Sequence, residues 1–187
     1  MDKIWNYKNF NMVYELDVAG EFIYDGIQAL NQMNSISIGA PIFSFLYHLS
    51  VGIERLQKII LVLFEDITLE NYEEFEKSLI THSHGYLHER ISKKVNVDFN
   101  SRENEFLTLL STFYNHSRYN RFNFNASLNQ EKELLEEYIL KYINDYFLYY
   151  SMNEYLQFDL SIKKWYNINN KVIGVILCVS QYVMIIY

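Results

Sequence analysis

The chain has 187 residues, half of them hydrophobic, with only one Pro and six Gly. This composition offers too few tight turns for a sheet protein and favours long helices in a single domain with a sizeable core. The formal net charge of −7 argues against non-specific binding of nucleic acid through the overall field. The basic residues are unevenly placed, because four of the five His and six Lys and Arg lie between His82 and Arg121. That segment is the first place to expect a functional site.

The cysteine content and the two ends of the chain favour a cytoplasmic protein. Cys178 has no second cysteine with which to form an intramolecular disulfide, which fits a reducing compartment. Residues 1–10 lack the basic region and apolar core of a secretory signal. Residues 172–187 are uncharged, but the run is shorter than the roughly 18–20 residues that span a bilayer. We expect a buried terminal helix over about 170–187, with a strand or a membrane anchor as alternatives.

In chain order, residues 1–18 show no clear period and are predicted to form an arm packed on the fold. A first helix is predicted over about 19–34, followed by a loop. The segment 41–65 is predicted to be the central helix, with Pro41 in its first turn. Its apolar residues recur at steps of four and three and so share one helical stripe: Ile42, Leu46, Leu49, Ile53, Leu56, Ile60 and Leu63. Residues 59–64 are apolar throughout, so other helices are expected to enclose that end.

Three further helices are predicted after the central one. Asn71 and Glu74 have the spacing of a capping box and begin a helix that runs to about Val95. Ser101 is the expected N-cap of the next helix, and Ser127 with Gln130 forms a second capping box for a long helix to about residue 151. The whole chain is therefore predicted to be one all-α domain, residues 1–187. Its architecture is a single bundle of five to six helices with a core of about 20–150.

The recognisable catalytic motifs are missing from the sequence. It has no phosphate-binding glycine loop, nucleophile elbow or paired-cysteine redox motif. His84 and His88 are four residues apart on a predicted helix, which is the spacing of two zinc ligands. His84 also falls on the apolar stripe of that helix, where a hydrogen-bonded core histidine is the simpler interpretation. We expect no metal and no cofactor.

The segment 116–122, HSRYNRF, mixes arginine, asparagine and aromatic residues at the end of a predicted helix. Arginine can bind phosphate with two hydrogen bonds, aromatic rings can stack on bases, and asparagine can read base edges. The segment is therefore a candidate RNA contact. In the alternative interpretation, Arg118 and Arg121 pair with carboxylates of neighbouring helices and Tyr119 and Phe122 fill a gap.

Three stretches in order, GIERLQKIILVL, LITHSHGYLHERI and EFLTLLSTFYNHSRYNRF, precede a long helix. This layout, over about residues 20–150, resembles the HEPN superfamily of helical-bundle domains. The resemblance implies a homodimer in a bacterial toxin–antitoxin, phage-defence or RNA-processing setting. HEPN ribonucleases are similar to one another in an Arg-x(4–6)-His motif that cleaves RNA without a metal. Arg118 or Arg121 matches the arginine, but no histidine follows either one.

The leading hypothesis is a HEPN-like domain that binds RNA or a partner protein, including an antitoxin, without the usual ribonuclease site. RNA contacts are expected from Arg118, Tyr119, Asn120, Arg121, His84 and His88. A catalytic version would be a metal-independent endoribonuclease with Arg118 on the phosphate and His116 as the proton-transfer group. Two rival hypotheses are a purely structural interaction module, whose Tyr-rich last long helix is the contact surface, and a membrane-anchored protein.

Overall fold

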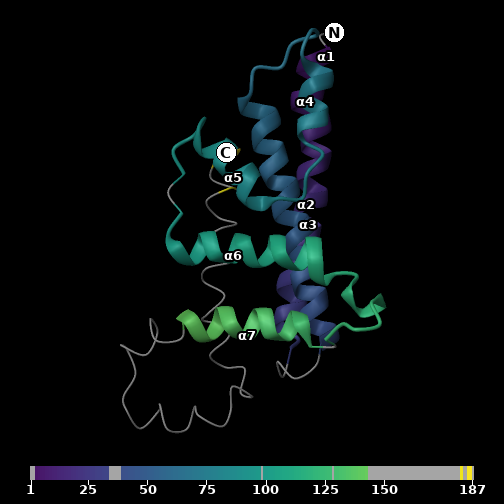
Figure 1. Ribbon diagram of the computed structural model, residues 1–187. Helices are drawn as coiled ribbons and strands as arrows, with labels where there is room; N and C mark the ends of the chain where they lie inside the picture. Colours follow the sequence, from purple (N-terminus) through teal and green to yellow (C-terminus); the bar gives the residue numbers. More distant parts are fainter. Residues whose placement is uncertain are drawn as a thin grey trace.

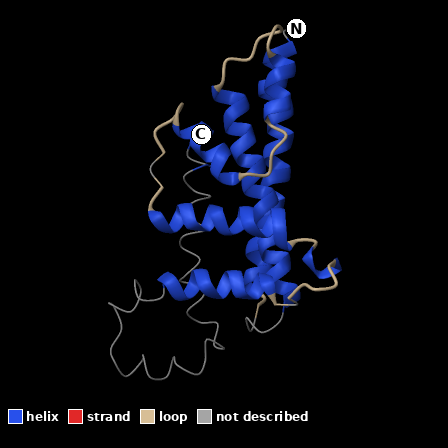
Figure 2. Ribbon diagram, viewed as in Figure 1, coloured by secondary structure: helices blue, strands red, loops and turns tan. Residues whose placement is uncertain are grey.

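The computed structural model describes residues 3–33, 39–97, 99–127 and 129–142, together with Tyr182, Ile185 and Ile186. Every regular element in these ranges is helical (Figures 1 and 2). The elements are α1 (Lys3–Asn6), η1 (Tyr7–Asn11), α2 (Met12–Asn31), α3 (Gly39–Phe64), α4 (Tyr72–Ser78), α5 (His84–Ser92), α6 (Ser101–Thr112), η2 (Phe113–Ser117), η3 (Asn120–Phe122) and α7 (Gln130–Tyr142). The all-α helical bundle predicted from the sequence is confirmed.

The long helices α2 and α3 run antiparallel, and α6 and α7 cross them lower in the view, one beneath the other (Figure 1). The approach of α2 to α3 is close because glycines face the partner helix. A Cβ atom added at Gly52 would lie 2.7 Å from the Ile23 Cγ1 atom and 3.2 Å from the Ala19 carbonyl oxygen. A Cβ atom at Gly26 would lie 2.9 Å from the side chain of Leu49. The two backbones can pack at this distance only because neither glycine carries a side chain.

The core is arranged around α3, as the sequence predicts. Six of the seven stripe residues are at most 1 % exposed and the seventh, Leu63, is partly buried. Ile59, Leu61 and Val62 on the other sides of the helix are buried too. Enclosure at this end is incomplete, since Phe64 remains exposed. Pro41 lies in the first turn of α3, where its missing N–H costs no intrahelical hydrogen bond.

The predicted boundary between an arm at residues 1–18 and a first helix from about 19 is wrong, because residues 3–18 are helical and α2 already begins at Met12. The buried face of α2 is a regular stripe of Leu16, Ala19, Ile23, Gly26 and Leu30, at steps of three and four. Two of these five are small residues, Ala19 and Gly26, so a search for periodic large apolar side chains detects the stripe poorly. Exposed aromatic residues on the opposite face obscure the period further.

The helix predicted from Asn71 to about Val95 is also wrong, because it is two helices, α4 and α5, with a break at 79–83. The Ser83 side chain caps α5 by accepting a hydrogen bond from the Tyr86 N–H, at 3.3 Å. The Thr81 hydroxyl accepts from the Ser83 N–H at 3.1 Å. These side chains offer the backbone local partners that compete with a continuous helix. Asn71 accepts from the Thr68 N–H rather than capping α4.

The N-cap of helix α6 lies one residue earlier than predicted, and the helix ends in a π-turn. Asn100, not Ser101, is the N-cap, and it forms a reciprocal capping box with Glu103. At the other end the Arg118 N–H donates to the Phe113 carbonyl oxygen, 3.0 Å away, which is a spacing of five residues. Single π-turns within helices occur frequently at functional sites.

The predicted continuation of the last long helix beyond residue 142 and the predicted terminal helix at 170–187 fall mostly outside the described residues. Tyr182, Ile185 and Ile186 are the exceptions: Tyr182 is buried within the core, and the two isoleucines are partly buried against it. Among the described helices, none combines the length and the apolar character needed to cross a bilayer.

Candidate functional site

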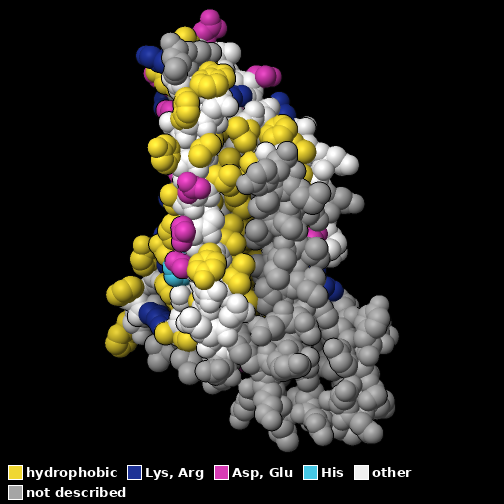
Figure 3. Space-filling view, turned by 180° about the vertical axis from the view of Figure 1, so that it is seen from behind, with side chains coloured by type: hydrophobic (Ala, Val, Ile, Leu, Met, Phe, Trp, Pro, Cys, Tyr) yellow, Lys and Arg dark blue, Asp and Glu magenta, His cyan; other side chains and the backbone are white. Residues whose placement is uncertain are grey.

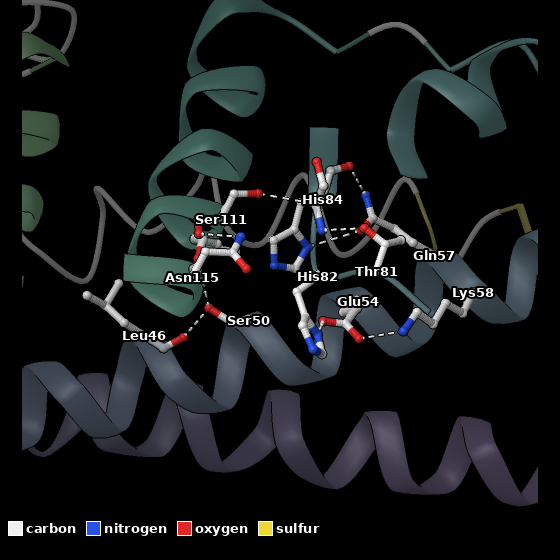
Figure 4. Close-up of polar contacts among 12 residues, drawn as sticks. Leu46, Ser50, Glu54, Gln57, Lys58, Thr81, His82, His84, Ser111 and Asn115 are labelled. Carbon is white, nitrogen blue, oxygen red and sulfur yellow. Dashed lines mark hydrogen bonds and ion pairs between the residues drawn. The ribbon is translucent and has the colours of Figure 1, made fainter. Parts of the chain in front are cut away.

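A row of polar side chains interrupts the otherwise apolar surroundings of α3. Ser50, Glu54 and Gln57 follow one another at i, i+4 and i+7, so they share one face of the helix, and all three are buried. This face looks toward the 79–83 segment and the first turn of α5, as Figure 4 shows. Polar groups at such positions need partners, because an unsatisfied buried polar group is costly.

Glu54 holds two cationic or potentially cationic groups, one on each carboxylate oxygen. Lys58 Nζ lies 2.6 Å from Oε1, and His82 Nδ1 lies 2.9 Å from Oε2 (Figure 4). The Glu54 side chain is 10 % exposed, whereas that of His82 is 50 % exposed. An ionised carboxylate only accepts hydrogen bonds, so Nδ1 of His82 carries the hydrogen and neutral His82 presents an unprotonated Nε2.

Arg118 and His82 both contact the ring of Tyr114. The rings of His82 and Tyr114 have centroids 4.8 Å apart. The Arg118 guanidinium carbon is 3.9 Å from the Tyr114 ring centroid and 4.5 Å from that of Tyr119. Among the described residues no carboxylate pairs with Arg118, and its buried Nε has no hydrogen-bond partner there. The guanidinium is held by aromatic faces, an arrangement to which arginine is suited.

His84 and His88, predicted to contact RNA, point into the core and toward the Tyr182 side chain. His84 Nδ1 is 3.1 Å from Gln57 Oε1, and complete burial lowers the pKa of His84 to about 4. It is therefore neutral at pH 7, with a buried Nε2 that has no partner among the described residues. His88 Nδ1 is 3.0 Å from the Tyr182 hydroxyl oxygen, and burial lowers its pKa as well.

The two histidines belong to one buried polar network, because Gln57, the partner of His84, also donates to the Tyr182 hydroxyl, 2.7 Å away, that contacts His88. Within the described ranges there is no group of three or more His, Cys, Asp or Glu side chains that could hold a metal ion. The ionisable side chains gathered near this place are those of His82, Glu54, Lys58 and Arg118.

The other predicted RNA contacts divide into paired and exposed side chains. Arg121 forms an ion pair with Glu131, which is 2 % exposed, and so takes the structural role that the alternative interpretation expects for an arginine. Asn120 donates to the Gln130 side chain. Tyr119 is 65 % exposed. His116 is exposed and makes no hydrogen bond or ion pair with the described residues.

Sequence reasoning missed the combination of Glu54, His82 and Tyr114. The period of α3 carried a signal, since Ser50, Glu54 and Gln57 place polar side chains at helical spacing on a largely buried helix. The position of His82 carried none, because it depends on the break between α4 and α5. The arginine–histidine motif of the HEPN resemblance also directed the search to His116, two residues before Arg118, rather than to His82.

Comparison with protein-family models, with curated proteins and with solved structures finds no match to this chain. The resemblance to HEPN domains therefore stays a prediction.

Proposed function

We propose that this chain is a HEPN-like helical domain that binds single-stranded RNA through Arg118 and the aromatic side chains around it, in the bacterial cytoplasm and in a defence or toxin–antitoxin setting. The observation that carries the proposal is the state of the Arg118 guanidinium. It is fixed between two tyrosine rings and has no carboxylate partner among the described residues. A phosphate group would supply the missing anion.

The contrast with the neighbouring cations supports this role. Arg55 pairs with Glu15 and Arg90 pairs with Glu65, while Arg121 is held by Glu131 as described above. Acidic residues outnumber basic ones in this chain, whose net charge is −7. An arginine without a carboxylate partner is therefore less expected here than in a basic protein, and it is better evidence for a bound anion. The same charge disfavours binding through the overall field, so contact must come from a local site.

The exposed aromatic side chains that follow Arg118 in the sequence fit unpaired bases. Tyr119, Phe122 and Phe124 are 65, 87 and 101 % exposed. Exposed aromatic rings near an arginine that binds phosphate form a stacking surface for single strands, and each stacked base contributes about 1–3 kcal/mol to binding. A double helix would hide its bases from these rings, so single-stranded RNA is the better ligand.

The test is the anisotropy of a labelled, 2′-O-methylated single-stranded oligonucleotide, titrated with protein over a salt series. Arg118→Ala should weaken binding at least tenfold and make the salt dependence shallower, because one phosphate contact is lost. Lys93→Ala is the matched control, since it removes one exposed positive charge on α5 whose partner is the exposed Glu89. Wild-type protein that fails to bind at low salt, or equal affinity of the two variants, would refute the proposal.

A second candidate function is binding of a partner protein, favoured by a row of exposed apolar side chains. Trp5, Phe10, Val13, Tyr14 and Tyr24 on α1, η1 and α2 are each at least half exposed. Figure 3 shows hydrophobic side chains repeated along this face. Aromatic residues are enriched in protein interfaces. Under this alternative the partner is a second copy of this chain, so Tyr14→Lys abolishes self-association in sedimentation velocity, and RNA binding is absent.

A further inference from the structure

A cavity of about 270 Å³ lies between α1, η1, the loop 65–71 and α4. Figure 1 shows α1 and α4 together at one end of the molecule, away from α6 and α7. Most of the cavity wall is apolar and comes from Ile4, Ile67, Leu69 and Phe75. Leu69 is exposed, so a ligand can enter from solvent. Pockets for drug-sized ligands span about 300–1,000 Å³, so this cavity suits a smaller molecule.

Hydrogen bonds hold the wall of the cavity in place. Lys8 Nζ donates to the Glu65 carbonyl oxygen, 2.8 Å away, which ties η1 to the end of α3. Within the loop, the Asn71 side chain donates to the Asp66 carbonyl oxygen at 3.0 Å and accepts from the Thr68 N–H at 2.8 Å. A cavity that is already formed loses less conformational entropy when a ligand binds.

Two exposed side chains of opposite charge, Lys3 and Glu76, line the cavity. Among the described residues neither side chain forms an ion pair or a hydrogen bond, with the other or with a third group. The neighbouring Glu73, in contrast, accepts a hydrogen bond from the Tyr72 hydroxyl at 3.2 Å. Partial burial raises the pKa of Tyr7, and the nearby Glu76 carboxylate raises it further. The wall therefore combines apolar surface with a neutral tyrosine, an unpaired cation and an unpaired anion of the described chain.

The two charges restrict the class of ligand. A simple anion would be attracted by Lys3 and repelled by Glu76, and a simple cation would meet the reverse. A neutral apolar molecule would displace water from both charged groups without replacing their hydrogen bonds, which is costly. A zwitterion with an apolar body offers a partner to each charge and to the apolar wall.

We propose that this cavity binds a free α-amino acid with a large apolar side chain. The ammonium group of the ligand pairs with Glu76, and its carboxylate pairs with Lys3, in charge-assisted hydrogen bonds. Its side chain lies against Ile4, Ile67 and Phe75. The cavity shares no residue with the site at Arg118, so the amino acid binds whether or not the chain binds RNA.

The test is isothermal titration calorimetry of the full chain at pH 7, with L-leucine and L-phenylalanine as probes. At least one of them should bind saturably at one site per chain, and glycine, which lacks the apolar side chain, should bind at least tenfold more weakly. The N-acetyl derivative of the probe lacks the ammonium group, and its amide lacks the carboxylate. Each derivative should also bind at least tenfold more weakly than the parent amino acid, a loss of about 1.4 kcal/mol.

Variants of the two charged residues connect each ligand charge to its partner. Lys3→Met should weaken binding at least tenfold and abolish the preference for the amino acid over its amide. Glu76→Gln should weaken it similarly and abolish the preference over the N-acetyl derivative. Lys77→Met and Glu74→Gln are matched controls, since they remove the same charges from exposed positions of α4 that do not line the cavity. Their affinities should stay within about twofold of wild type.

Absence of saturable binding of both probes overturns the inference. So does an amide that binds as tightly as its parent, because the ligand would then be a simple cation held at Glu76. An N-acetyl derivative that binds as tightly as its parent overturns it as well, in favour of an anion held at Lys3. These comparisons use wild-type protein and do not depend on the folding of a variant. An equal loss of affinity in the control variants would mean that net charge, and not the cavity, determines binding.

Discussion

The contact between α2 and α3 gives the sharpest stability prediction, through a pair of glycine-to-alanine substitutions. Alanine in place of glycine within a helix is worth about 1 kcal/mol. At Gly20 a Cβ atom would meet nothing within 4 Å, so Gly20→Ala should show most of this gain. At Gly52 the new atom would lie 2.7 Å from Ile23 Cγ1 and 3.1 Å from the Ile23 backbone nitrogen. Overpacking of this kind costs about 1–3 kcal/mol, so Gly52→Ala should be destabilising by up to about 2 kcal/mol.

Urea denaturation followed by circular dichroism measures both variants against wild type. The urea midpoint should rise for Gly20→Ala and fall for Gly52→Ala. The m-value, which is the slope of the unfolding free energy against urea concentration, should stay the same, since neither change alters the surface exposed on unfolding. For a chain of this size a difference of 1 kcal/mol corresponds to about 2–4 °C in melting temperature. If Gly52→Ala is as stable as Gly20→Ala, the helices do not approach as closely as the structure places them.

Four further predictions concern the core, the buried charges and assembly. Leu56→Ala should cost about 2–5 kcal/mol of unfolding free energy, because Leu56 is fully buried in α3; a loss under about 1 kcal/mol in urea titration would contradict its core position. His84 has a folded pKa of about 4, below its unfolded value. The unfolded state therefore binds more protons between pH 6.5 and 4, and stability should fall by up to about 3 kcal/mol on acidification through that window. His84→Asn should remove this component, and an unchanged pH slope would refute it. Arg121→Ala should lower the melting temperature because Glu131 is left buried without its partner, whereas Arg118→Ala should leave it nearly unchanged; equal melting of the two would remove the distinction. Sedimentation at micromolar concentration should show a dimer, and a clean monomer would contradict the assembly implied by the HEPN resemblance.

The elements predicted best from the sequence are those whose buried face consists of large apolar side chains. The stripe of α3 from Ile42 to Ile60 was predictable residue by residue, because each member is big enough to mark the period. The buried face of α2 was not, because Ala19 and Gly26 contribute closeness of approach rather than apolar bulk. Small residues stabilise the fold by letting the partner helix pack closely against them. The sequence of one helix does not show which helix is its partner, so this contact could not be predicted.

The candidate site was predictable only in part, for the same reason. The segment around Arg118 was found from its composition, which is local information. The neighbour of Arg118 is Tyr114, four residues earlier, and through it His82 of a distant loop. That loop takes its position from the hydroxyl groups of Thr81 and Ser83, whose hydrogen bonds to the backbone interrupt the helix. Short polar residues in a helical pattern are ambiguous in sequence, since they are tolerated within helices and also end them.

Burial of a carboxylate is by itself weak evidence for chemistry, as the three buried acids of the described core show. Glu103 closes the capping box of α6, and Glu131 holds Arg121 near the start of α7. Both are accounted for by structure alone. Glu54 differs because one of its two partners is a histidine that remains half exposed. An apolar residue at position 54 would avoid the desolvation cost of a buried ion pair. Stability therefore gives little reason for an acid there, and the orientation of His82 gives a specific one.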